Sequence, residues 1–223
     1  MPERGKSKLR FILGFTLFFA ALWLLWNTVL VYPLKIFVVL LHEVSHAMVA
    51  VATGGSIQQI TLDPRQGGAC YCPGGNAFLT LSAGYLGSLL WGGLMISAAR
   101  SKRVKTSLVN GIIGGLVIGL TILYVRNGFG IAFGIAFGLA MIVASRKLSA
   151  GLNRSLLLTL GLTSALYAIL DIKSDVLDRP ELQSDAHMLA ELTGVPTVAW
   201  GAIWIAAALA FSFWLLRRAY QDA

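Results

Sequence analysis

Two histidines and a glutamate lie within five residues of one another, in a stretch that is otherwise apolar enough for lipid. Residues 40–48 read Leu-Leu-His-Glu-Val-Ser-His-Ala-Met. On an α-helix, His42 and His46 lie about 40° apart on one face and one turn apart in height, which suits two nitrogen ligands of one zinc ion. Glu43 projects beside them and can accept a proton from a water molecule whose pKa the metal has lowered to roughly 7. The spacing therefore indicates a metal-assisted amide hydrolase, with Glu43 as the general base.

The composition places this motif in a membrane protein. Of the 223 residues, 57% are hydrophobic and 13% charged, and the mean hydropathy is +0.74. These values exclude an ordinary soluble domain. The net charge of +8 comes from Lys and Arg at the ends of apolar runs, without basic and aromatic residues interleaved. Membrane topology and lipid headgroups explain this pattern, and a nucleic-acid partner is not expected.

Apolar runs divide the chain into predicted spans. The basic segment 1–10 precedes an apolar run, 11–31, which is too long for a signal-peptide core and is predicted to be an uncleaved first span. The second helix starts at Pro33, carries the histidines and ends near Thr53, where Gly54 and Gly55 follow. Further spans are predicted at 77–99, 108–125, 129–145, 156–172 and 198–216.

A polar, turn-rich segment, 56–76, follows the histidine helix. It contains a strand-like piece, 57–62, and two glycine pairs, so we expect a short β-hairpin or re-entrant loop that lies over the site. Cys70 and Cys72 are spaced too closely for a comfortable disulfide and are too few for a four-cysteine metal site. The pair is expected to have a structural or incidental role.

Small residues indicate where helices pack closely. Ala83 and Gly84 each have a small partner four residues later in the third predicted span, and the run 130–138 repeats Gly-Ile-Ala-Phe. Such stripes allow helix backbones to approach each other. The spans at 108–125 and 129–145 are therefore predicted to be packing helices without chemistry of their own.

Later aspartates could supply a third metal ligand. If the second to sixth segments all cross the membrane, the histidines, the end of the sixth span and the loop before the last span share one side. Asp171 lies within a predicted span, where a carboxylate is expensive enough to indicate function. Asp175 is one helical turn further on, and Asp185 begins a short helix capped by Ser184. Asp171 is the preferred ligand, with Asp185 and Asp175 as alternatives; His187 is expected to be exposed.

Several motifs together resemble the site-2 protease-like membrane zinc metallopeptidases, in particular their compact branch without a PDZ domain. The resemblance extends from about residue 42 to residue 204. It is carried by 41–47 (Leu-His-Glu-Val-Ser-His-Ala), Thr53-Gly54-Gly55, 60–64 (Ile-Thr-Leu-Asp-Pro), Gly67-Gly68, 82–88 (Ser-Ala-Gly-Tyr-Leu-Gly-Ser), Leu170-Asp171-Ile172, Ser184-Asp185-Ala186, Trp200-Gly201 and Trp204.

The resemblance implies a zinc ion held by His42, His46 and a later aspartate, with Glu43 as general base, in an enzyme that cuts peptide bonds within or near the membrane. One departure concerns the third ligand. In better-studied members the aspartate is followed by glycine, whereas Ile172 follows Asp171 here, so all three aspartates remain candidates.

The sequence thus predicts one all-α polytopic membrane domain over residues 1–223, with six or seven transmembrane helices and a hairpin or re-entrant loop after the metal-binding helix. Its expected partners are the lipid bilayer and a membrane protein or peptide substrate, and its expected location is the cell membrane. The alternative function is a non-catalytic scaffold or metal-handling protein that retains the zinc site. The predicted parts are 1–32, 33–99, 100–154 and 155–223.

Overall fold

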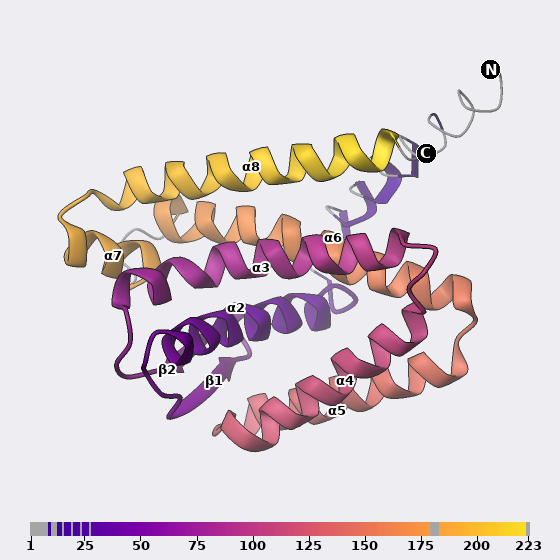
Figure 1. Cartoon of the computed structure of the whole chain (residues 1–223), viewed down its shortest axis with the longest axis horizontal. Helices are drawn as coiled ribbons and strands as arrows, with labels where there is room; N and C mark the ends of the chain where they lie inside the picture. Colours follow the sequence, from indigo (N-terminus) through magenta and orange to yellow (C-terminus); the bar gives the residue numbers. More distant parts are fainter. Residues whose placement is uncertain are drawn as a thin grey trace.

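A computed structural model describes residues 9, 13, 14, 16–18, 20–22, 24–26, 28–178 and 183–221. Its helices and strands are α2 (Tyr32–Ala52), β1 (Gln59–Asp63), β2 (Gly67–Tyr71), α3 (Ala77–Arg100), α4 (Thr106–Tyr124), α5 (Gly128–Lys147), α6 (Ala150–Lys173), the π-helical turn η1 (Ser174–Asp178), α7 (Asp185–Thr193) and α8 (Thr197–Gln221). Figure 1 shows the long helices side by side, with the hairpin beside α2.

The predicted architecture is confirmed. Within the described residues, six helices are long and apolar enough to cross a membrane: Tyr32–Ala52, Ala77–Arg100, Thr106–Tyr124, Gly128–Lys147, Ala150–Asp178 and Thr197–Arg218. The predicted first span, 11–31, lies partly outside the described residues, so a seventh crossing stays a prediction.

The core forms around α2, which packs against α3, α6 and the hairpin. Buried residues such as Ile36, Phe37 and Leu40 lie in one cluster with Ile60 and Leu62 of β1. Alternate residues of a strand point to one face, so the 59–63 strand places both apolar side chains on α2. Burial of these side chains in turn sets the register of the hairpin.

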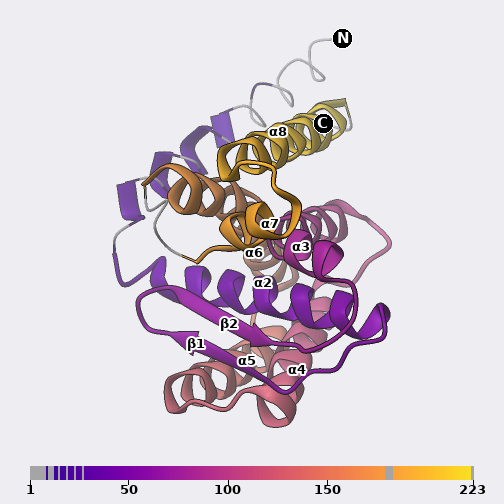
Figure 2. The same cartoon turned by 90° about the vertical axis from the view of Figure 1, so that its left-hand side faces the viewer.

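The predicted β-hairpin is also confirmed, and it runs back along α2 (Figure 2). The strands pair antiparallel, with Ile60 opposite Cys70 and Leu62 opposite Gly68. At the turn, Tyr32 Oη donates a hydrogen bond to the Pro64 carbonyl oxygen at 2.8 Å, which ties the hairpin tip to the start of α2.

The predicted glycine packing between α4 and α5 is observed. Gly134 is buried, and a Cβ built on it would overlap Oγ1 of Thr121. One helical turn on, a Cβ on Gly138 would lie 2.7 Å from the Gly114 carbonyl oxygen. Small residues therefore let these two backbones touch, as expected for helices in lipid.

The spacing of the two cysteines was expected to be too tight for a comfortable disulfide, and this expectation was wrong. Cys70 and Cys72 form a disulfide, with Cα atoms 5.5 Å apart, so their role is structural. Residues two apart in extended chain project to the same side, and this Cα separation is within the usual range for a disulfide.

Candidate metal centre

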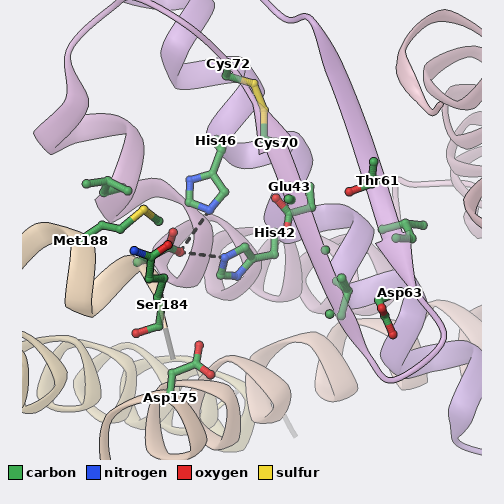
Figure 3. A pocket seen from close by; sticks show the side chains of 18 of the residues that line it. His42, Glu43, His46, Thr61, Asp63, Cys70, Cys72, Asp175, Ser184 and Met188 are labelled. Carbon is green, nitrogen blue, oxygen red and sulfur yellow. Dashed lines mark hydrogen bonds and ion pairs between the residues drawn. A yellow bond between two sulfur atoms is a disulfide. The ribbon is translucent and has the colours of Figure 1, made fainter. Parts of the chain in front are cut away.

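The two histidines of α2 meet an aspartate that comes from a different part of the chain. Asp185 Oδ2 lies 2.9 Å from Nε2 of His42 and 3.1 Å from Nε2 of His46. The dashed lines in Figure 3 mark these contacts with the two rings. Convergence of the histidines with the late aspartates, expected from the order of the spans, is therefore observed.

Asp185 is brought to the histidines by the short helix α7. Its N-cap is Ser184, whose side chain accepts a hydrogen bond from the His187 N–H at 3.3 Å, and its C-cap is Gly194 with φ of 73°. The start of this helix and its Ser184 cap were predicted from the sequence. On the inner face, the buried Ala186 and Leu189 hold α7 against the rest of the protein.

The surroundings of Asp185 favour its charged form. Burial alone would raise the pKa of this carboxyl, but the imidazoles of His46 and His42 act in the opposite direction and hold the pKa of Asp185 well below its usual range. A carboxylate that stays ionised is a suitable ligand for a divalent cation.

The three side chains fit a tetrahedral metal ion. Their ligand atoms all lie within 4.8 Å of one another, and bonds of about 2.0 Å at tetrahedral angles require ligand atoms about 3.3 Å apart. In addition, α3 leaves space beside the ring nitrogens. A Cβ on Gly84 would overlap Nε2 of His42 and lie 2.6 Å from Nε2 of His46, so only glycine fits there.

The hydrogen bond at the other nitrogen of His46 orients its ring. His46 Nδ1 lies 2.7 Å from the Thr80 carbonyl oxygen. A carbonyl oxygen only accepts, so Nδ1 carries the proton and Nε2 has its lone pair free for a metal.

Glu43 is buried next to the histidines and beneath β2, as Figure 3 shows. The backbone N–H of Cys70 donates a hydrogen bond to its carboxylate. A Cβ on Gly68 would lie 2.7 Å from Oε1 of Glu43. The strand can therefore approach the carboxylate only with glycine at this position.

The other two aspartates occupy different positions. Asp171 Oδ2 lies 3.7 Å from Nδ1 of His42, the nitrogen that faces away from Asp185. Asp175 accepts a hydrogen bond from Tyr85 Oη at 2.7 Å. His187 lies outside the group and pairs with Glu191 at 3.5 Å.

One edge of the hairpin is already paired. The Arg126 N–H donates to the Ile60 carbonyl oxygen at 3.1 Å. Asn127 binds both backbone groups of Leu62, accepting from its N–H at 3.1 Å and donating to its carbonyl oxygen at 2.7 Å. The turn between α4 and α5 therefore covers the outer edge of β1.

The outer edge of β2, on the opposite side of the hairpin, faces a cavity. Because Ile60 and Leu62 direct their backbone groups away from β2, the residues opposite them, Cys70 and Gly68, direct theirs away from β1. The hairpin has two strands within the described residues. A cavity of about 1030 Å³ borders β2. Its lining includes His42, His46 and Asp185, together with Glu43, Asp171, Asp175 and Met188.

The specific roles of Gly84, Gly68 and Thr80 at the site were not predicted from the sequence. Gly84 belongs to the small-residue stripe and Gly68 to a glycine pair, so both patterns were visible. Neither pattern says which neighbour the glycine accommodates, because that depends on how the helices and the hairpin sit against α2.

Comparison with known proteins identifies the family of the chain. A family model described as Peptidase M50B-like matches residues 15–215. No curated protein and no solved structure gives a significant match to the chain. Because the family model covers most of the chain, including the histidine helix and α7, the protein belongs to the M50B-like family of membrane metallopeptidases.

Proposed function

We propose that the protein is a zinc-dependent intramembrane endopeptidase, with His42, His46 and Asp185 as the zinc ligands and Glu43 as the general base. The observation that carries this proposal is the convergence of two Nε2 atoms and one carboxylate oxygen beside a buried glutamate. Zinc bound there would acidify a water molecule and polarise the scissile carbonyl.

Asp185 is preferred over the first candidate of the sequence analysis on chemical grounds. An imidazole that binds a metal through Nε2 directs Nδ1 away from that metal. Asp171 is near Nδ1 of His42, whereas Asp185 is near Nε2 of both rings. Asp175 is engaged by Tyr85, which leaves Asp185 as the best-placed oxygen ligand.

The protein residues divide the work of hydrolysis. Glu43 takes the proton from the attacking water and afterwards delivers it to the leaving amine, as a general base and then a general acid. The carboxylate is held between the Cys70 N–H and the Gly68 backbone. This fixed position keeps it within reach of the reacting atoms throughout a turnover.

The edge of β2 is the proposed binding surface for substrate. An extended peptide would pair with the backbone groups of Gly68 and with the carbonyl oxygen of Cys70, whose N–H is used by Glu43, and would so pass Glu43. A transmembrane substrate helix must unwind locally to offer such a strand. The proposed substrates are therefore membrane proteins or peptides, and the cell membrane stays the predicted location.

The alternative is a non-catalytic scaffold or metal-handling protein. Glu43 argues against it, since a buried carboxylate beside the metal ligands, without a bond to the metal, costs stability and adds nothing to a structural site. Zinc binding alone does not separate the two functions, whereas proteolysis does.

The test uses the full chain in lipid vesicles with labelled transmembrane peptides. We expect cleavage by the purified protein, its loss after chelation and its return with zinc. The His46→Ala variant should cleave nothing even with zinc added, because one of three ligands is gone. Equal cleavage by the wild type, the chelated protein and this variant would contradict the proposal.

A further inference from the structure

The two rings of the metal centre are held in the same way at one nitrogen and differently at the other. Both direct Nε2 at Asp185, as described above. For His46, Nδ1 meets a backbone carbonyl oxygen of α3. For His42, the group facing Nδ1 is instead a carboxylate, that of Asp171 on α6.

We propose that Asp171 is a positioning residue, which holds the Nδ1–H of His42 and thereby directs Nε2 of that ring toward the metal. The proposal rests on the zinc site of the proposed function. It assigns Asp171 a different role from that of zinc ligand, for which Asp171 was the preferred candidate in the sequence.

The contact has the charge and burial that this role needs. Oδ2 of Asp171 and Nδ1 of His42 are 3.7 Å apart, and their side chains are 20% and 13% exposed. This separation is a little longer than a hydrogen bond, and a small rotation of the carboxylate would convert the contact into one. An imidazole with a carboxylate at its second nitrogen is a more basic ligand than one with a carbonyl there.

The plane of the His42 ring is fixed from another side. Tyr85 meets it edge-on, with ring centroids 5.0 Å apart, and Tyr85 is itself anchored by its hydrogen bond to Asp175. Tyr85 thus restricts the tilt of the ring, while Asp171 selects which nitrogen carries the proton. Without Asp171, the ring keeps its place but loses its preference for the tautomer that binds metal at Nε2.

The experiment measures zinc affinity of the full chain in detergent by competition with a chelator, together with the zinc coordination shell by X-ray absorption. Asp171→Ala should weaken zinc binding about 10- to 100-fold. Asp171→Asn, which keeps an acceptor oxygen, should recover much of this loss. In both variants the zinc should keep two imidazoles and one carboxylate.

Two further variants calibrate the result. Asp185→Ala should weaken binding more than either Asp171 variant and change the shell, because it removes a proposed ligand. Asp178→Asn is the matched control, since Asp178 lies on η1 and pairs with Lys173 at the surface; its zinc affinity should equal that of the wild type. If Asp171→Ala does not fold, Asp171→Leu, which is close in size but has no acceptor, takes its place and should show the same loss of affinity.

Two results would overturn the inference: zinc affinity unchanged in Asp171→Ala, or loss of a carboxylate from the zinc shell in an Asp171 variant. Because the readout is metal binding, an unchanged affinity leaves the proposed proteolysis standing, and a lost carboxylate changes only the assignment of the third ligand. Conversely, a protein that shows the Asp171 effect but cleaves nothing contradicts only the proposed function. A wild type that binds no zinc contradicts both.

Discussion

Helix α2 and the α4–α5 pair show two ways of using an apolar sequence in a membrane. In α2, 67% of the most apolar 18-residue window is buried, whereas the corresponding value for α5 is 22%. Buried Lys35, Glu43 and His46 lie on α2, while α5 buries three glycines and Met141. Lipid tails are as apolar as leucine, so enclosure by protein is needed only where polar groups must be shielded.

The two regions nevertheless meet at the hairpin. Through Arg126 and Asn127, the turn between α4 and α5 covers the edge of β1. The edge of β2 faces the cavity. The packing pair was expected to have no chemistry of its own. It contributes to the site indirectly, because by covering the edge of β1 it leaves the edge of β2 as the proposed binding surface for a peptide.

The largest difference between the regions should appear when one methyl group is added to each. We expect Gly84→Ala to weaken zinc binding about 100-fold, because its Cβ would overlap Nε2 of His42 and overpacking of this kind costs about 1–3 kcal/mol. Gly115→Ala on α4, where a Cβ meets nothing within 4 Å, is the matched control and should bind zinc normally. Titration of each purified variant with zinc checks this prediction, and equal affinities would contradict it.

Substitution of a second glycine, Gly68, should impair catalysis without affecting metal binding. Gly68→Ala places a Cβ 2.7 Å from Oε1 of Glu43 and 2.9 Å from Cγ1 of Val39. Displacement of the general base should lower kcat about 100-fold, with unchanged zinc content. Gly67→Ala, whose Cβ would lie at an ordinary 3.7 Å from Cβ of Asp63, should lose far less. Similar losses of kcat in the two variants would show that the Gly68 contact is unimportant.

A change in the packing pair should affect stability and spare the metal. Gly134→Ala overlaps Oγ1 of Thr121 and should lower the free energy of unfolding by about 1–3 kcal/mol. Zinc affinity should stay at the wild-type value, because neither helix supplies a proposed ligand. Thermal unfolding in detergent and chelator competition measure the two quantities, and a parallel loss of zinc affinity would show that the regions are coupled.

The smallest effect is expected where the regions touch. Asn127→Ala removes two hydrogen bonds to Leu62 and should destabilise the hairpin by about 1–2 kcal/mol. Because β2 is the proposed substrate edge, KM should rise about tenfold while kcat changes little. Asn127→Asp retains the acceptor for the Leu62 N–H and should show a smaller rise. A fall in kcat without a change in KM would place the hairpin's role in chemistry instead of binding.

Sequence reasoning reached the helix motif, the spans and the hairpin because each depends on local pattern. Helical spacing sets the faces of His42, Glu43 and His46, and hydropathy sets the spans. The choice among Asp171, Asp175 and Asp185 depends on lateral packing, since the predicted order of the spans places all three on one side of the membrane. Which of them approaches Nε2 is determined by how α7 docks on α3 and α8, and no local pattern encodes this docking.

The most direct test of the account is cleavage by Glu43→Gln compared with the wild type at equal measured zinc content. Glutamine keeps the size of the side chain but cannot accept the proton of the attacking water. We expect the variant to bind zinc as the wild type does and to cleave transmembrane peptides at least about 100-fold more slowly. Wild-type cleavage rates in the zinc-loaded variant would contradict it.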